Sequence, residues 1–75
     1  MEHQYELDTR GLKAPIPVLR LKQATAQIKK GEVLRLLSDD ERSQTDVKAF
    51  AYHARHALLD AQVEGRDFVF LLEKG

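Results

Sequence analysis

A chain of 75 residues without cysteine must hold its fold with one hydrophobic core, because no disulfide can stabilise it. This length is close to the lower limit for a domain of that kind. Hydrophobic residues make up 43% and charged residues 32%, which is typical of a globular protein and not of a disordered one. We therefore expect one domain over residues 1–75. The absence of cysteine also excludes thiolate metal sites and thiol nucleophiles.

The charges of the chain cancel, with twelve basic and twelve acidic residues. This balance argues against the strong positive field that binds nucleic-acid phosphates. The longest apolar runs cover only a few residues, whereas a membrane span needs about 20. The N-terminal segment MEHQYELD lacks the basic and apolar regions of a signal peptide. We therefore expect a cytoplasmic protein with no membrane contact and no direct nucleic-acid binding.

The first half of the sequence predicts a strand, a turn and a helix. Residues 4–8 alternate polar and apolar side chains, as a half-buried strand does, and residues 8–11 form a turn. From Pro15 onward, residues recur at helical spacing at Val18, Leu21, Ala24, Thr25 and Ile28. We expect the helix to end at Lys29-Lys30-Gly31, because basic residues and glycine favour helix C-termini.

The second half predicts a buried strand over residues 32–38, a polar loop over residues 38–42, a helix and a β-hairpin. Ser43 and Asp46 have the spacing of a capping box at the helix start. The apolar arc of this helix comprises Val47, Phe50, Ala51, Ala54 and Leu58. Two alternating runs, one with Leu59, Ala61 and Val63 and one with Phe68, Phe70 and Leu72, flank a turn over residues 64–67 and form the hairpin.

This order of elements predicts an α+β fold with the arrangement β-α-β-α-β-β. Two amphipathic helices each need an apolar surface to cover, and one four-stranded sheet offers it. A helical crossover between the first two strands makes them parallel, and the final hairpin makes the sheet mixed. We expect a two-layer α/β sandwich in which two helices cover one face of a four-stranded mixed sheet.

The stretch GLKAPIPVLRLK contains the strongest local signal in the chain. Pro15 and Pro17 fix a helix start near Ala14, because proline lacks the N–H group that has no partner in the first helical turn. Unpaired N–H groups and the positive end of the helix dipole stabilise anions and lower the pKa of a thiol. With Arg10 and Lys13 close in sequence, we expect residue 14 to lie in an electropositive place.

The segment LDTRGLKAPIPVLRLK resembles the TusA/SirA sulfur-carrier family, whose pattern is Asp, Gly-Leu and then Cys-Pro-x-Pro. The similarity continues through GEVLRLLSDD, TDVKAF, the segment around His56 and the C-terminal FVFLLEKG. The resemblance implies a carrier whose cysteine accepts sulfur as a persulfide. The donor is a cysteine desulfurase or a rhodanese-like enzyme, and an acceptor protein uses the sulfur in tRNA thiolation or sulfur metabolism. By position, the cysteine falls on Ala14, and four further residues match, namely Asp8, Gly11, Pro15 and Pro17.

Alanine at position 14 removes the chemistry that the resemblance implies. A methyl group has no lone pair and cannot ionise, so this chain cannot carry sulfur as a persulfide. Two explanations stay open: an engineered Cys-to-Ala substitution, favoured because the surrounding motif is intact, or a natural variant that keeps the scaffold. The leading hypothesis is an inactive form of a sulfur carrier. The alternatives are a cysteine-less interaction or regulatory module and, more weakly, a nucleic-acid-binding domain.

Several charged residues are candidates for binding partners or ions. We predict partner binding at Arg20, Lys22 and His56, and a basic rim formed by Arg10, Lys13, Arg20 and Lys22, although solvated charges are the usual role of such side chains. His53 and His56 are three apart, but no further ligand is evident, and residues 39–41 lack the spacing of a calcium loop. We therefore expect a monomer without metal or cofactor.

Overall fold

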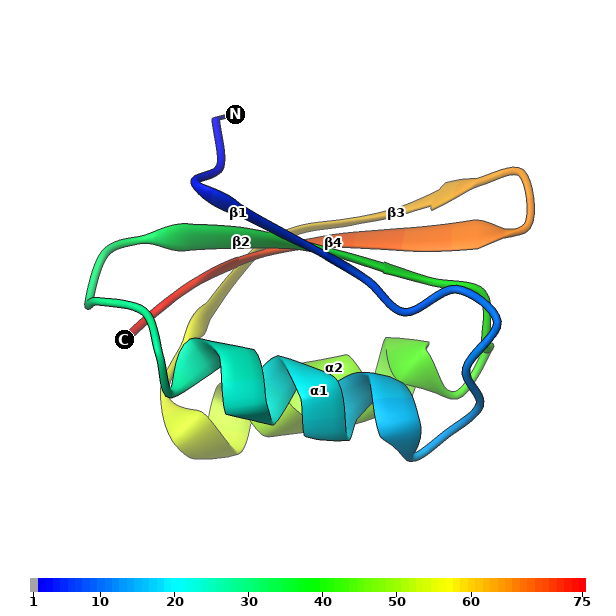
Figure 1. Cartoon of the computed structure of the whole chain (residues 1–75), viewed down its shortest axis with the longest axis horizontal. Helices are drawn as coiled ribbons and strands as arrows, with labels where there is room; N and C mark the ends of the chain where they lie inside the picture. The colour runs from blue at the N-terminus through cyan, green and yellow to red at the C-terminus, as the bar shows by residue number, and fades with distance from the viewer. Residues whose placement is uncertain (1) are drawn as a thin grey trace.

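The computed structural model describes residues 2–75 and has the expected β-α-β-α-β-β order (Figure 1). The elements are β1 (Tyr5–Asp8), α1 (Ile16–Thr25), β2 (Val33–Ser38), α2 (Ser43–Ala54), β3 (Ala57–Glu64) and β4 (Asp67–Glu73). Within the described residues, neither helix has the length and apolar composition needed to cross a membrane.

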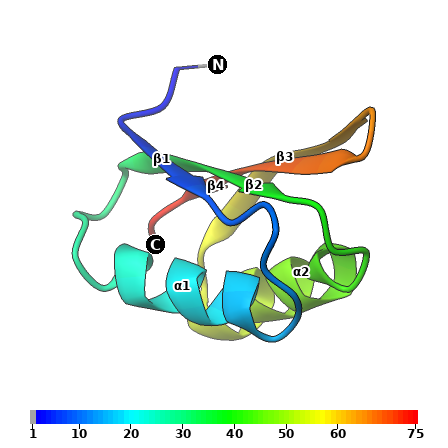
Figure 2. The ribbon, with the colours of Figure 1, turned by 45° about the vertical axis from the view of Figure 1, so that its right-hand side comes forward.

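The four strands form one mixed sheet in the order β1-β2-β4-β3. β1 and β2 are parallel, as the α1 crossover requires, and β4 pairs antiparallel with both β2 and β3. Both helices lie on the same face of the sheet (Figures 1 and 2). The predicted two-layer α+β sandwich is confirmed.

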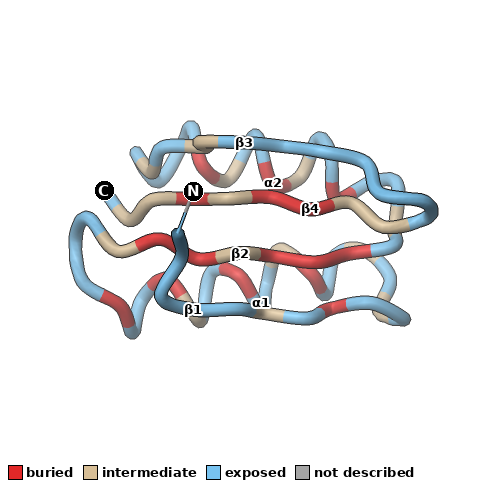
Figure 3. The backbone as a smooth tube through the Cα atoms, turned by 90° about the horizontal axis from the view of Figure 1, so that it is seen from above, coloured by how far each residue is buried: buried red, intermediate tan, exposed pale blue. Residues whose placement is uncertain are grey.

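The core lies between the two central strands and the two helices. Viewed from above, β2 is mostly buried and β4 consists of buried and intermediate residues, whereas β1 and β3 form the mostly exposed edges (Figure 3). Alternate residues of the central strands point toward the helices because side chains on a strand alternate between faces. The buried cluster comprises Leu21, Ile28, Leu34, Leu36, Val47, Ala51, Phe70 and Leu72. Each large side chain contributes about 1.5–3 kcal/mol by leaving water.

Helix α1 is shorter than the sequence predicts. It ends at Thr25, and the prediction that it continues to Lys29-Lys30-Gly31 is wrong. The ammonium group of Lys74 donates a hydrogen bond to the Thr25 carbonyl at the end of the helix. Ile28 lies in the turn that follows and is still buried in the core. Apolar periodicity therefore extends beyond the helix, because the core also requires an apolar residue in this turn.

Helix α2 also differs from the prediction at both ends. Ser43 does not cap it: the Ser43 hydroxyl donates to the Asp40 carbonyl (2.5 Å), and the N-cap residue is Arg42. The helix ends at Ala54, because Arg55 has left-handed backbone angles (φ 61°). Leu58, predicted on the helix, instead pairs with Leu72 in the sheet.

The β-hairpin is confirmed, with two differences in its details. The predicted turn over residues 64–67 is shorter, because Glu64 and Asp67 belong to the strands and pair with each other. A bulge between Leu58 and Asp60 interrupts the ladder. Leu59 therefore falls out of the predicted alternation with Ala61 and Val63, because a bulge shifts every side chain before it to the other face.

Candidate functional site

The residues predicted to form a site come together at one end of the molecule. β1 and β2 are parallel, so their carboxyl ends lie side by side, and each strand leads into the start of a helix there (Figure 1). The loop of residues 9–15, which we call the residue-14 loop, follows β1. The loop of residues 39–42, which we call the acidic loop, follows β2. Hydrogen bonds join the two loops.

Ala14 is half-buried and lies two residues before the first residue of α1. Its peptide bond to Pro15 is cis. Pro15 is the N-cap residue of the helix, and Pro17 is buried in the first turn. The Ile16 N–H donates to the Lys13 carbonyl (2.9 Å), which closes the turn before the helix. The predicted helix start beside residue 14 is confirmed, and the side chain at this position is not sealed inside the core.

Carboxylates of the acidic loop accept hydrogen bonds from backbone N–H groups of the residue-14 loop. The Ala14 N–H donates to Asp40 Oδ2 (2.6 Å), and the Gly11 N–H donates to both carboxylate oxygens of Asp39 (3.0 Å each). Unpaired N–H groups were expected at the helix start, but in the loop just before it the Gly11 and Ala14 N–H groups have acceptors. The partners are 26 and 28 residues apart in sequence, so local pattern could not reveal them. The bond from Ala14, followed by that from Arg42, holds the pKa of Asp40 below its usual value.

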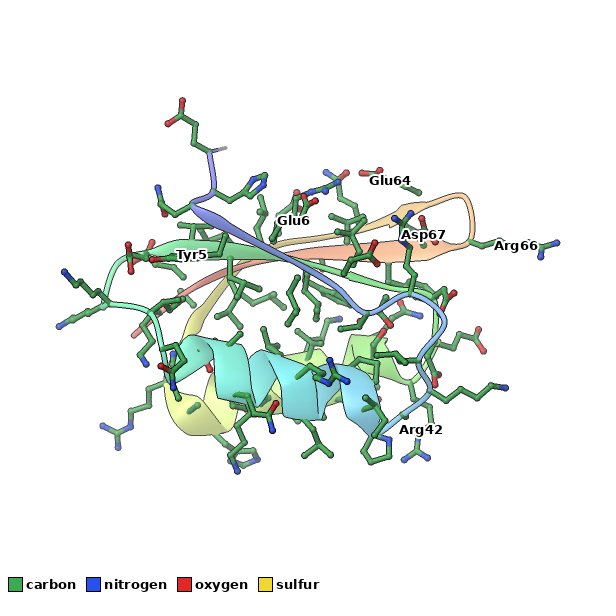
Figure 4. The ribbon with its side chains drawn as sticks, in the orientation of Figure 1. Tyr5, Glu6, Arg42, Glu64, Arg66 and Asp67 are labelled. Atoms are coloured by element: carbon green, nitrogen blue, oxygen red, sulfur yellow. The ribbon has the colours of Figure 1, made fainter. Side chains whose placement is uncertain are left out.

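Arg10 forms ion pairs with two other carboxylates, those of Asp8 and Asp67. Its Nε and Nη2 atoms donate to the two oxygens of Asp8 (2.9 and 2.8 Å), and Nη1 donates to Asp67 (3.1 Å). The guanidinium thus joins the end of β1 to the start of β4, where Figure 4 labels Asp67. These bonds lower the pKa of Asp8 to about 2 and raise that of Arg10. The expectation that Arg10 makes the surroundings of residue 14 electropositive is therefore wrong. Lys13 is exposed nearby.

Lowering the pH from about 4 to about 2 should remove the stabilisation that Asp8 provides. Hydrogen bonds from Arg10 lower the pKa of Asp8 from 3.8 to about 2 in the folded chain, so the unfolded chain takes up a proton first as the pH falls. The contribution of Asp8 is full above pH 3.8 and is lost as the pH approaches 2. In urea titrations, Asp8→Asn should unfold at lower urea than the parent chain near neutral pH. If the difference in urea midpoint between Asp8→Asn and the parent chain stayed constant down to about pH 2, the assignment would be contradicted.

The predicted partner-binding residues do not all lie near residue 14. Arg20 and Lys22 are exposed on α1, the helix that begins at the site. His56 lies beyond the opposite end of α2, where its Nδ1 atom accepts the Gly75 N–H (2.9 Å) and its ring packs on Phe50 at 5.4 Å. Burial and the charge of Lys74 lower the pKa of His56. Partner binding by these three residues stays a prediction, and His56 has an additional contact within the chain.

An open cavity of about 640 Å³ lies beside the residue-14 loop. Its lining combines both loops with the β3–β4 hairpin: Gly11, Lys13, Asp39, Asp40, Glu41, Arg66 and Phe68. Arg66 projects from the hairpin end in Figure 4. Sequence reasoning placed Arg66 in a turn and Phe68 in the core. It missed their place at the site because strand register, and not sequence spacing, brings the hairpin to this end.

The histidine pair considered for metal binding is not arranged on one helix. His53 is in the last turn of α2, but His56 follows the left-handed residue Arg55. Over residues 2–75, no group of three or more His, Asp or Glu side chains is placed to hold a metal ion.

Comparison with known proteins gives consistent matches over nearly the whole chain. The model of the family described as Sulfurtransferase TusA matches residues 5–74. The sulfur carrier protein TusA of Allochromatium vinosum is 38% identical over 69 residues, which cover 92% of this chain and 91% of that protein. A Neisseria meningitidis protein described as a candidate sulfur carrier is 40% identical over 67 residues, covering 89% and 90%.

Among solved structures, the crystal structure of a SirA-like protein from Desulfitobacterium hafniense superposes with a TM-score of 0.85. The match covers 96% of this chain and 99% of that one at 23% identity, and it supports the fold.

Proposed function

The chain belongs to the sulfurtransferase TusA family. We propose that it binds a sulfur donor and a sulfur acceptor in turn, as a persulfide carrier does, but that residue 14 loads no sulfur. The observation that carries the proposal is the position of Ala14. It stands at the proline-fixed start of α1, only half-buried, where the family pattern has its cysteine. A methyl group at this point leaves the docking surface in place but removes the nucleophile.

We assign the donor to the cysteine desulfurases or rhodanese-like enzymes and the acceptor to proteins of tRNA thiolation or sulfur metabolism. The exchange is placed in the cytoplasm, and the chain acts as a monomer. No cofactor takes part, because transfer of a persulfide sulfur needs only thiol groups. These assignments rest on the family pattern around Ala14.

The surface beside residue 14 suits a protein partner. On α1, Ile16 is 38% and Leu19 is 47% exposed, so two large apolar side chains face solvent beside the site. Two lysines are exposed close by: Lys13 lies in the residue-14 loop and Lys22 lies on α1. Apolar side chains ringed by charge are typical of docking surfaces, where burial supplies affinity and charge supplies orientation. We propose that donor and acceptor each bind here in turn.

A second candidate function is an interaction or regulatory module that occupies sulfur-relay partners. It is favoured by the hydrogen bonds that fix the residue-14 loop, since backbone N–H groups donate them to Asp39 and Asp40 and the side chain of residue 14 takes no part. The loop therefore needs no cysteine to keep its shape. Such a module would reduce the flow of sulfur through its partners by competition.

The docking proposal is tested by competition with a cysteine-containing TusA relative for sulfur from a cysteine desulfurase. Increasing concentrations of this chain should slow persulfide formation on the relative, while this chain gains no mass. Lys22→Glu should raise the concentration for half-inhibition about fivefold, which corresponds to about 1 kcal/mol of binding free energy. Lys30→Glu reverses the same charge beyond the other end of α1 and should have little effect. Unchanged persulfide formation at a large excess of the chain would refute docking.

A further inference from the structure

We propose that Asp40 is a positioning residue for position 14: its carboxylate fixes the backbone there and disfavours a negative charge on the side chain. The proposal deepens the function above and rests on position 14 being the family's sulfur-bearing position. In the sequence, Asp40 belongs to a polar stretch with no distinguishing pattern. Its role follows from contacts that form only in the folded chain.

The geometry holds Asp40 from several sides. One carboxylate oxygen accepts the Ala14 N–H (2.6 Å), and the other accepts the Arg42 N–H (3.0 Å). The Asp40 N–H donates to Ser38 Oγ (3.2 Å), and its carbonyl accepts both the hydroxyl and the N–H of Ser43 (2.5 and 3.0 Å). Ser38 and Ser43 are both buried. Because these bonds hold the Asp40 side chain in one conformation, its carboxylate can hold the Ala14 backbone in place.

Asp39 binds the same loop at Gly11, which precedes residue 14. Its carboxylate accepts the Gly11 N–H, and Gly11 has a φ of +86°, a left-handed conformation that glycine adopts without strain. Together, Asp39 and Asp40 hold residues 11 and 14, so the segment between them is tied to the acidic loop at both ends. The backbone at residue 14 is therefore held against the acidic loop, which connects β2 to α2.

The carboxylate of Asp40 also sets the local electrostatics. It lies within hydrogen-bond distance of the residue-14 backbone, so an anion on that side chain would experience a like charge. The N–H that could have stabilised such an anion is already donated to Asp40. Lys13 and Arg42 are the nearby cations that act on Asp40, while Asp39, Glu41 and Arg66 line the adjoining cavity. We therefore expect a thiol introduced at position 14 to ionise less readily than the helix start alone would allow.

The contact itself is tested in the unmodified chain by following the Ala14 amide proton resonance during a pH titration. Its chemical shift should change with a single midpoint below the usual range for aspartate, because protonation of Asp40 weakens the acceptor. Asp40→Asn should abolish this titration, whereas Glu41→Gln should preserve it, because within residues 2–75 the Glu41 carboxylate makes no hydrogen bond to the residue-14 loop. A titration that persists in Asp40→Asn would overturn the assignment.

The effect on the side chain is tested in the Ala14→Cys background. Asp40→Asn keeps an oxygen acceptor but removes the charge, so the thiol pKa should fall by about one unit. Alkylation by iodoacetamide below that pKa should accelerate about threefold, because the roughly tenfold gain in thiolate is partly offset by its lower nucleophilicity. Asp40→Ala should accelerate alkylation similarly but slow transfer from a protein donor, because only the donor needs residue 14 held in place. Glu41→Gln controls for loss of a loop charge and should change the thiol pKa less.

These measurements separate the inference from the proposed function. If no donor loads sulfur on the Ala14→Cys chain but Asp40→Asn still lowers the thiol pKa, the carrier assignment fails and the electrostatic role of Asp40 stands. If sulfur loads normally and Asp40→Asn leaves the thiol pKa unchanged, the inference about Asp40 fails and the carrier assignment stands.

Discussion

Ala14→Cys should convert a chain that takes up no sulfur into one that accepts a single sulfur atom from a cysteine desulfurase supplied with cysteine. The new thiolate at position 14 attacks the outer sulfur of the donor's persulfide. The donor's S–S bond breaks, a new S–S bond forms at position 14, and the donor cysteine leaves as a thiolate. The methyl group of the parent chain has no electron pair to start this exchange. The expected change is therefore from no loading to nearly one sulfur per chain.

Intact-protein mass spectrometry measures this result directly as a gain equal to the mass of one sulfur atom, which a reducing thiol should reverse. Ala14→Ser is the matched control, because it introduces a side chain of similar size without sulfur and should gain nothing. The half-buried position of residue 14 leaves the side chain within reach of a donor loop. Failure to load from several competent desulfurases and rhodanese-like donors would remove the carrier assignment.

Leu36→Ala should destabilise the fold by about 2–5 kcal/mol, because it leaves a cavity at the centre of the core. Leu36 is fully buried on β2 and pairs with Phe70 across the sheet, where it also faces the helices. A domain of this length has a free energy of unfolding of roughly 4–11 kcal/mol, estimated at about 0.05–0.15 kcal/mol per residue. The substitution therefore removes a large part of the total stability.

Urea titration followed by circular dichroism gives the loss in unfolding free energy. Leu19→Ala is the matched control: it makes the same change on α1 at a side chain that is 47% exposed, and it should cost well under 1 kcal/mol. Equal losses for the two variants would contradict the assignment of Leu36 to a tightly packed core. Because the sheet positions both loops of the site, we also expect the Leu36→Ala variant to lose docking when it is partly unfolded.

The order of the elements followed from the sequence because alternation and helical spacing are local patterns. The two-residue alternation of Phe68, Phe70 and Leu72 placed β4 correctly, since a strand half-covered by helices must alternate. The helix ends were less accurate. Ile28 continued the helical period although α1 had ended, and Leu58 did so although it belongs to β3. A core selects apolar residues in turns and strands as well, so periodicity alone cannot mark where a helix stops.

The family resemblance carried by the Ala-Pro-Ile-Pro segment is confirmed by the match over residues 5–74. The position of residue 14 beside a helix start was also predictable, because proline restricts its own backbone wherever it occurs. The electrostatics of the site were not predictable in this way. Arg10 was expected to make the surroundings of residue 14 more positive, but it binds Asp8 and Asp67 instead.

The sequence alone determined that this chain forms a mixed sheet under two helices, that a helix begins beside Ala14 and that no thiol chemistry can occur there. Only the tertiary structure decided which groups surround that position. Parallel pairing of β1 with β2 brings the acidic loop against the residue-14 loop, and Asp40 then binds the Ala14 amide across 26 residues of sequence. The physical reason is that backbone preferences act between neighbours in the chain, whereas hydrogen bonds between loops exist only after the sheet has aligned the strands that carry them.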